Sequence, residues 1–262
     1  MIGWLRRRRL SRRADELVPD QSEFDALCNA SACLARLDLE ERARLRRLAA
    51  MILASKEFHG AGGLQPEWEH CLPVAVHAAL PVLNTGLEAY RQFRTFILYE
   101  DEFESEFEEY DDAGVVHRGR DRRAGEAWHR GPVVLSLADV AQSGLGDGYH
   151  VVVHELAHQI DQLTGDADGC PPLPAGIGFA DWASGFTAAF EALERQLAAG
   201  TEPDIDPYAA ESPAEFFAVT SEFFFDLPER LFATQPEVYR LLARLYRQDP
   251  LTRARRSGAI TR

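Results

Sequence analysis

The sequence is poor in cysteine, methionine and lysine: it has four cysteines, two methionines and one lysine, Lys56. The cysteines, which are Cys28, Cys33, Cys71 and Cys170, form no C-x-x-C pair. They also lack the regular spacing of a small disulfide framework. This argues against a disulfide-stabilised secreted domain and indicates free thiols in a reducing compartment, so we expect the protein in the cytoplasm.

Long apolar runs are also missing. The longest are VLSLADVA and PVAVHAALPVL, well short of the roughly 18 apolar residues that span a bilayer. The chain opens with the basic stretch MIGWLRRRRLSRR, but no apolar segment of about 7–15 residues follows it, as a signal peptide would require. We therefore expect neither a membrane span nor secretion.

Basic residues are outnumbered by acidic ones, 28 against 42, so the formal net charge is -14. Such a field repels nucleic acid and anionic membranes, so general affinity for either is excluded and no specific nucleic-acid partner is expected. The basic cluster from Arg6 to Arg13 is the local exception. A solvated, disordered tail is its favoured interpretation, with an anchor for anionic surfaces or nucleic acid as the alternative.

The chain has enough apolar residues, 46%, for a substantial core. Apolar residues at three- and four-residue spacing predict two amphipathic helices between residues 20 and 55, joined near Asp38. Another helix is expected over 66–84, with Pro66 in its first turn and Pro73 kinking or dividing it.

Two runs rich in aromatic or β-branched residues, FRTFILY at 93–99 and GPVVLSLADV at 131–140, predict strands. The acidic and arginine-rich stretch between them is typical of a solvated loop or hairpin, and a docking surface for a cation or peptide is the alternative. Further helices are expected at 179–198, 213–225 and 236–247. The fold class is therefore α+β and mostly helical, with a small sheet.

This pattern predicts one domain over residues 20–250. We expect a basic tail at 1–19 and a C-terminal tail at 251–262.

The stretch VVVHELAHQIDQLTGDADG, which begins at Val151, carries the clearest chemical signal. His154 and His158 are four residues apart, so on a helix both imidazoles face the same point and can bind one ion. Glu155 then lies beside the metal as a general base for a water that zinc would activate. Asp147 or Gly148 would begin the helix. The alternative is a helix that carries two structural histidines.

A catalytic zinc ion needs a third protein ligand. The extended pattern H-E-x-x-H-x-x-G-x-x-H does not apply, because Asp161 and Thr164 occupy its glycine and last histidine positions. The later segment DPYAAESPAEFFAVTSEFFF offers Glu211, Glu215 and Glu222 as carboxylate ligands.

Three of these acidic residues, Glu215, Glu222 and Asp161, also have a second interpretation. Glu215 fits a capping box that begins at Ser212, so its side chain could cap a helix instead. Glu222 lies among phenylalanines and needs a partner, which could be a ligand histidine instead of the metal. Asp161 could hydrogen-bond a ligand imidazole or be exposed.

Four blocks of the sequence resemble the Mlc titration factor A family of bacterial zinc metallopeptidases. They are GAGGL from Gly60, GEAWHRGPVVLSLADV from Gly125, HELAHQIDQLTGDADGCPPL from His154, and YAAESPAEFFAVTSEFFF from Tyr208. Together they extend over residues 58–227.

The resemblance implies a zincin-like fold with a gluzincin-like site. In that site His154, His158 and Glu215 bind Zn²⁺, and Glu155 is the base. Tyr208 would hydrogen-bond the developing oxyanion, while a buried core tyrosine is the alternative. The strand at 131–140 would be the edge of a small mixed sheet, bordering the cleft and able to pair with an extended peptide.

The leading hypothesis is therefore a cytoplasmic zinc metallopeptidase, of aminopeptidase type on small peptide substrates as the resemblance implies. The alternative is a regulatory protein that binds and sequesters a transcriptional repressor of the Mlc type. In that case the zinc site would be structural or vestigial, and peptidase activity secondary or latent.

Overall fold

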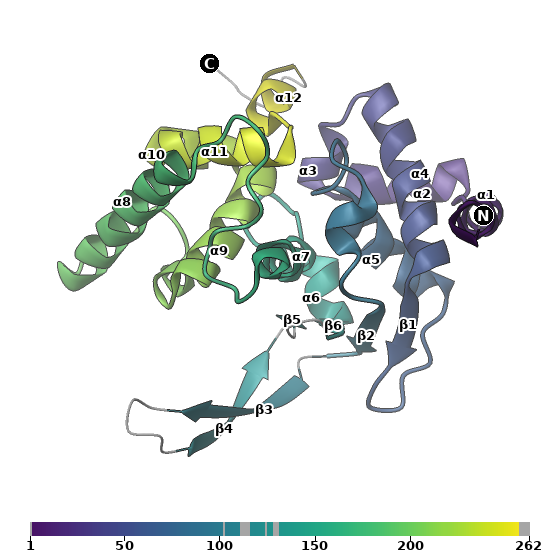
Figure 1. Ribbon diagram of the computed structural model, residues 1–262, viewed down its shortest axis with the longest axis horizontal. Coiled ribbons are helices and arrows are strands. Elements are labelled where there is room, and N and C mark those ends of the chain that lie inside the picture. Colours follow the sequence, from purple (N-terminus) through teal and green to yellow (C-terminus); the bar gives the residue numbers. More distant parts are fainter. Residues whose placement is uncertain (1, 102, 111–115, 124, 128–130, 257–262) are drawn as a thin grey trace.

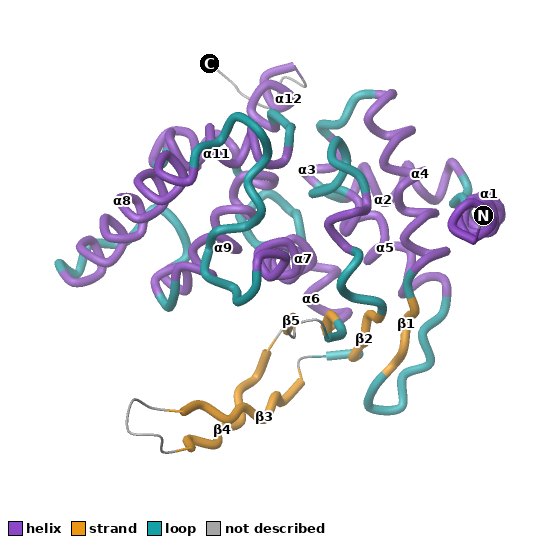
Figure 2. The backbone as a smooth tube through the Cα atoms, viewed as in Figure 1, coloured by secondary structure: helices purple, strands orange, loops and turns teal. Residues whose placement is uncertain are grey.

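The computed structural model describes residues 2–101, 103–110, 116–123, 125–127 and 131–256, with side chains for 8–101 and 131–256. Helices dominate it (Figures 1 and 2). Helix α7, Val151–Asp161, lies between an earlier group of helices and a later one, and the small sheet lies at one end of this arrangement (Figure 1). No helix of the described residues is long and apolar enough to cross a bilayer. The α+β, mostly helical prediction is confirmed.

The first group contains α1 (Ile2–Glu16), α2 (Gln21–Ala30), α3 (Ala32–Ala35), α4 (Leu39–Ser55) and α5 (Trp68–Ala79). The predicted junction near Asp38 is confirmed. The Asp38 side chain caps α4 by accepting from the Glu41 backbone N–H. The Glu41 carboxylate accepts from the Asp38 backbone N–H, which completes a capping box.

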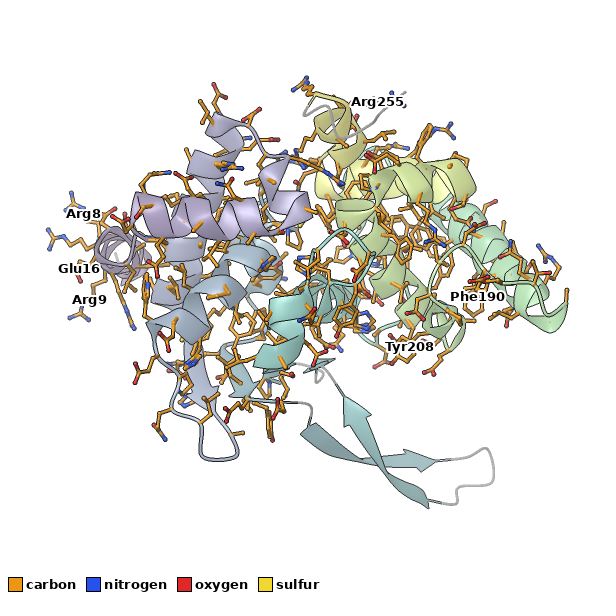
Figure 3. The ribbon with its side chains drawn as sticks, turned by 180° about the vertical axis from the view of Figure 1, so that it is seen from behind. Arg8, Arg9, Glu16, Phe190, Tyr208 and Arg255 are labelled. Carbon is orange, nitrogen blue, oxygen red and sulfur yellow. The ribbon has the colours of Figure 1, made fainter. Side chains whose placement is uncertain are left out.

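The N-terminal segment is helical, so the prediction of a disordered tail is wrong. Ala14 on α1 is fully buried and packs with Ala50 and Ala54 of α4. Small residues on both helices allow this close approach, and Arg8, Arg9, Arg12 and Arg13 are exposed. Figure 3 shows Arg8 and Arg9 at one end of the molecule, far from Tyr208.

Helix α5 begins later than predicted, and Pro73 does not divide it. Its N-cap is Glu67, so Pro66 precedes the helix, and the helix continues through Pro73. The proline removes one backbone hydrogen bond. The apolar residues around it, from Leu72 to Ala79, are almost entirely buried, and this burial offsets the loss.

The main sheet has the strand order β1-β2-β6-β5. Strands β1 (Glu57–Gly60), β2 (Thr95–Tyr99) and β6 (Val133–Ser136) are parallel, and β5 (Gly125–Ala127) is antiparallel to β6. The sheet is therefore mixed, as predicted. However, β6 lies between β2 and β5, so the prediction that this segment is an edge strand is wrong. All four β6 residues are buried, as expected of an interior strand.

The predicted strand at 131–140 also ends early, because the Ser136 hydroxyl accepts from the Asp139 backbone N–H and begins helix α6, Leu137–Gln142. The edge strand next to α7 is β5, which contacts that helix.

The acidic and arginine-rich stretch, for which a solvated loop or a hairpin was predicted, forms a hairpin. Strands β3 (Phe103–Tyr110) and β4 (Val116–Arg123) are antiparallel, and the register places Glu104 opposite Arg122, and Glu108 opposite Arg118. The hairpin extends away from the helices (Figures 1 and 2).

The later group of helices follows α7 and a short 3-10 turn, η2 (Gln162–Thr164). It contains α8 (Phe179–Ala198), η3 (Pro207–Ala210), α9 (Pro213–Asp226), α10 (Pro228–Thr234), α11 (Pro236–Tyr246) and α12 (Pro250–Arg256). A further 3-10 turn, η1 (Leu87–Tyr90), precedes β2. The predictions for α8, α9 and α11 are confirmed, whereas α6, α10 and α12 were not foreseen.

Helix α12 contradicts the prediction of a C-terminal tail from residue 251. Leu251 and Ala254 are buried, and Arg253 is 7% exposed. The Arg253 guanidinium forms a salt bridge with Glu41 on α4 at 2.6 Å. This contact joins segments 212 residues apart in the chain, and no local sequence pattern would indicate it.

Gly148, in the loop before α7, gives a test of how this helix is positioned. Its φ is +98°, and an added Cβ would lie 2.9 Å from the Phe223 ring on α9. We expect Gly148→Ala to lower the free energy of unfolding by about 1–3 kcal/mol, because both backbone strain and overlap oppose it. Urea unfolding measures the change.

Gly200→Ala is the matched control. Gly200 also has a positive φ, +67°, but no heavy atom of the described residues lies within 4 Å of the position that an added Cβ would take. The variant should retain only the backbone penalty, about 1 kcal/mol. Equal losses in the two variants would show that the approach of Gly148 to α9 is unimportant.

Candidate metal centre

Helix α7 carries the two motif histidines. Its N-cap is His150, not Asp147 or Gly148, because the His150 Nδ1 atom accepts the Val153 backbone N–H. The helix is buried along almost its whole length. His154 and His158 lie one turn apart on the same face, with the Nε2 atoms 3.2 Å from each other.

Helix α9 brings Glu215 to these imidazoles. The Ser212 hydroxyl accepts the Glu215 backbone N–H at 3.1 Å, so Ser212 caps the helix as predicted. The Glu215 side chain faces α7 instead, with Oε2 at 3.0 Å from His154 Nε2 and 3.4 Å from His158 Nε2. The capping position of Glu215 and a role for its carboxylate at the histidines are therefore compatible.

The three donor atoms fit a tetrahedral metal ion. Zinc binds nitrogen and carboxylate oxygen at about 2.0–2.2 Å, which puts tetrahedral donors roughly 3.3–3.6 Å apart. The observed separations are 3.0, 3.2 and 3.4 Å. The buried Glu215 Oε2 atom faces the two Nε2 atoms and has no other hydrogen-bond partner among the described residues, so it is available to an ion between them. Two structural histidines on a helix would not need this convergence.

The charges around the donors favour a cation. Burial lowers the pKa of His154, but hydrogen bonds to Glu215 and Glu222 outweigh it and hold that pKa well above its usual value. Burial raises the pKa of Glu215, yet the contacts with His154 and His158 outweigh it and bring that pKa well below its usual value. The pocket thus stabilises positive charge between these groups, which a divalent metal supplies.

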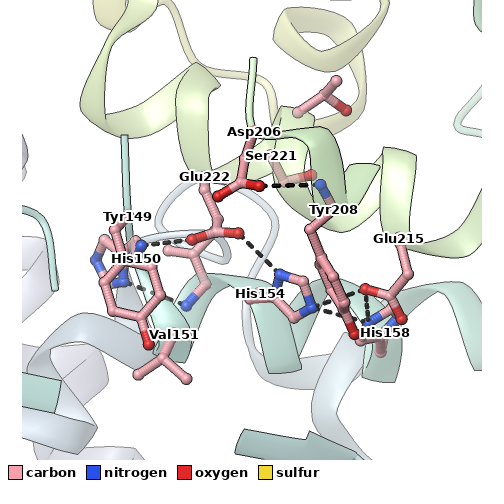
Figure 4. Close-up of polar contacts among 12 residues, drawn as sticks. Tyr149, His150, Val151, His154, His158, Asp206, Tyr208, Glu215, Ser221 and Glu222 are labelled. Carbon is pink, nitrogen blue, oxygen red and sulfur yellow. Dashed lines mark hydrogen bonds and ion pairs between the residues drawn. The ribbon is translucent and has the colours of Figure 1, made fainter. Parts of the chain in front are cut away.

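Glu222 does not join the three donors. Its Oε1 atom lies 2.8 Å from His154 Nδ1, and its other oxygen accepts the His150 backbone N–H (Figure 4). Of the two interpretations from the sequence, the hydrogen-bond partner of a ligand histidine is the one the geometry supports. This bond places the Nδ1 proton of His154 toward Glu222 and leaves Nε2 for the metal.

Glu222→Gln is expected to weaken zinc binding by roughly 10–100-fold, because the amide keeps the shape but loses the charge that raises the basicity of His154. Zinc affinity would be measured by competition with a chromogenic chelator. Glu191→Gln, an exposed change on α8, is the control and should bind like the unchanged protein. An unaltered affinity in Glu222→Gln would contradict the role given to this carboxylate.

Glu155 follows His154 on α7 and is 4% exposed. Burial is the largest cause of the raised pKa of Tyr149, and the charge of Glu155 adds to it. Glu155 is therefore a buried carboxylate next to one of the three donors on the same helix.

Tyr208 lies at the surface beside the donors. It belongs to η3, whose N-cap Asp206 accepts the Tyr208 backbone N–H at 2.9 Å. The side chain is 45% exposed, and its ring centroid is 6.0 Å from that of His154 (Figures 3 and 4). The alternative of a buried core tyrosine is therefore wrong.

Asp161 and Glu211 are not brought to the donors. Asp161 is fully buried and accepts the Gly169 backbone N–H at 2.7 Å, while its Oδ1 atom has no hydrogen-bond partner among the described residues. It is neither exposed nor hydrogen-bonded to a ligand imidazole, so both interpretations of it are wrong. Burial raises its pKa to about 6. Glu211 is exposed and follows η3.

A second group with metal-ligand types, Cys33, His77 and His150, was missed in the sequence because its members are far apart in the chain. His77 Nδ1 and His150 Nε2 are 3.0 Å apart. Since His150 Nδ1 accepts a backbone N–H, the proton of a neutral His150 is on Nε2 and points to His77. This contact is a hydrogen bond, which occupies the nitrogens a metal would need.

An HExxH helix with a carboxylate from a second helix is the arrangement of a class of metallopeptidases. The model of the glucose-regulated metallo-peptidase M90 family matches residues 2–247, and the chain belongs to this family. The resemblance described from the sequence is confirmed.

Curated relatives extend over most of the chain. Mlc titration factor A of Serratia proteamaculans is 39% identical over 238 residues, 90% of each chain. The protein of that name from Klebsiella pneumoniae is 37% identical over 228 residues, 86% of each chain. That from Salmonella arizonae is 33% identical over 259 residues, covering 97% of this chain and all of the relative.

Proposed function

We propose that this protein is a zinc-dependent peptidase. The observation that carries the proposal is the convergence of His154 Nε2, His158 Nε2 and Glu215 Oε2 from two helices. Three protein donors that leave one position open are what a catalytic zinc ion requires. The family is one of metallopeptidases, which supports the same class of activity.

His154, His158 and Glu215 would hold the ion, with Glu222 orienting His154. When bound there, zinc would polarise the scissile carbonyl and lower the pKa of a water toward about 7. Glu155 takes the proton of the attacking water and passes it to the leaving amine. The exposed hydroxyl of Tyr208 donates a hydrogen bond to the developing oxyanion.

The substrate in this proposal is a peptide, bound in extended form along β5. That strand is the edge of the sheet that contacts α7, and an edge strand offers unpaired backbone groups to a peptide. Small substrates cleaved from the amino end are the class that the family resemblance favours. The four free cysteines fit action in the cytoplasm.

A second function is favoured by the relatives, which are named as titration factors of Mlc. Such a protein would bind a transcriptional repressor and keep it from its operator. This function is compatible with the first, because repressor binding and peptide hydrolysis can use different surfaces.

Hydrolysis of a panel of aminoacyl and peptide chromogenic substrates by protein with one zinc ion per chain tests the proposal. Turnover that is lost on chelation and restored by zinc is the expected result. Absence of turnover on every substrate, together with capture of a purified Mlc-type repressor, would support the regulatory function instead.

A further inference from the structure

A cavity of about 300 Å³ opens between α2, α5 and α6. Its volume is at the lower end of the range for small-molecule sites. None of the residues proposed to hold zinc lines it. The walls are largely apolar and include Leu27, Pro73, Leu137 and Val140, while Glu69 and His70 add polar groups.

His77 lines this cavity from α5 and is only 6% exposed. Its protonation follows from its neighbour. His150 Nδ1 accepts the Val153 backbone N–H, so His150 Nε2 carries the proton and donates it to His77 Nδ1. Burial lowers the pKa of His77 to about 4, so this ring is neutral at pH 7. Because His77 Nδ1 accepts from His150, the proton of His77 is on Nε2.

The Nε2–H group of His77 has no hydrogen-bond partner among the described residues. The two serines of the cavity already donate elsewhere. Ser31 Oγ donates to the Gly144 carbonyl at 3.2 Å, and Ser143 Oγ to the Asp139 carbonyl at 2.9 Å. His77 Nε2 is not among the fully buried, unpaired side-chain atoms of the described residues, so the group is accessible, and His77 offers one directed hydrogen bond to whatever occupies the cavity.

We propose that this cavity binds a small, uncharged and largely apolar molecule whose carbonyl or hydroxyl oxygen accepts the His77 Nε2–H bond. The apolar walls supply the burial. The charged residue of the walls, Glu69, is exposed and already lies 3.9 Å from His70 Nε2, so a charged ligand would lose its hydration for little gain.

The position of the cavity indicates an effector rather than a substrate. His77 supports His150, which caps the first turn of α7 and donates its backbone N–H to Glu222. Glu222 in turn holds His154. An occupant would therefore contact His77, which hydrogen-bonds to the N-cap residue of the motif helix.

Cyclohexanone is a suitable probe because it is uncharged, apolar and has one acceptor oxygen. We expect it to bind saturably at one site per chain and to shift the ¹⁵N resonance of His77 Nε2 in ¹⁵N-histidine-labelled protein. Cyclohexylammonium, which has the same ring, a positive charge and no acceptor, should produce neither effect.

Three variants sharpen the test. His77→Phe keeps a flat ring but removes the donor, and should weaken cyclohexanone binding about threefold to tenfold, as one hydrogen bond would. Ala141→Trp, at an exposed position that lines the cavity, should fill it and abolish saturable binding while both histidines are retained. His59→Phe, at an exposed position outside the cavity, is the matched control and should change nothing.

Water alone in the cavity is the competing occupant. Cyclohexanone binding that never saturates, that is equally tight in His77→Phe, or that leaves the His77 resonance unmoved would each overturn the proposal. The measurement needs neither zinc nor peptidase activity, so its outcome is independent of the function proposed above.

Discussion

Glu155→Gln is expected to lower the kcat of peptide hydrolysis by about 10²–10⁴-fold, the usual contribution of a general acid–base group. Glutamine has nearly the same size, so the buried position beside His154 is filled as before, but the amide cannot take a proton from water. The variant should therefore keep one zinc ion per chain. Hydrolysis and metal content are measured on the same preparation.

Glu191→Gln serves again as the control, because it makes the same chemical change at an exposed position on α8 and should leave kcat and zinc content unaltered. Hydrolysis by Glu155→Gln at the rate of the unchanged protein would refute the assignment of the base. Loss of zinc from Glu155→Gln would also count against it, since a base is not a ligand.

The sequence predicted most of what depends on local spacing. His154 and His158 are on one face of a helix because four residues make about one turn, and Ser212 caps α9 because serine accepts a backbone N–H at that position. Glu215 shows the limit of such reasoning. Local pattern fits it to a capping box, and only the crossing of α7 and α9 brings its carboxylate to the imidazoles.

The expectations that failed concern contacts between distant segments. GPVVLSLADV was expected to be an edge strand, but the pairing of β5 with β6 buries it. The basic N-terminus resembles a tail by charge, yet Ala14 packs into α4. His77 and His150 carry no motif at all, and their hydrogen bond exists only because α5 packs against α7. Composition and periodicity describe local sequence only, so they do not predict these contacts between distant segments.

Glu215→Ala is expected to weaken zinc binding by more than about 100-fold, which is the upper figure for loss of an outer partner of a ligand. The variant removes one of only three donors, and His154 and His158 alone leave the ion half-coordinated. Competition with a chromogenic chelator measures the affinity. Hydrolysis should fall with it, because every catalytic role proposed here depends on the ion.

The control for Glu215→Ala is Glu211→Ala, an exposed carboxylate earlier in the chain that is not one of the three converging donors; it should bind zinc normally. The two active-site variants then have opposite signatures. Glu155→Gln keeps the metal and loses turnover, and added zinc cannot restore it. Glu215→Ala loses the metal, so excess zinc should recover part of its turnover. Normal zinc affinity in Glu215→Ala would mean that the third ligand is another group and that the approach of α9 to the histidines has a different purpose.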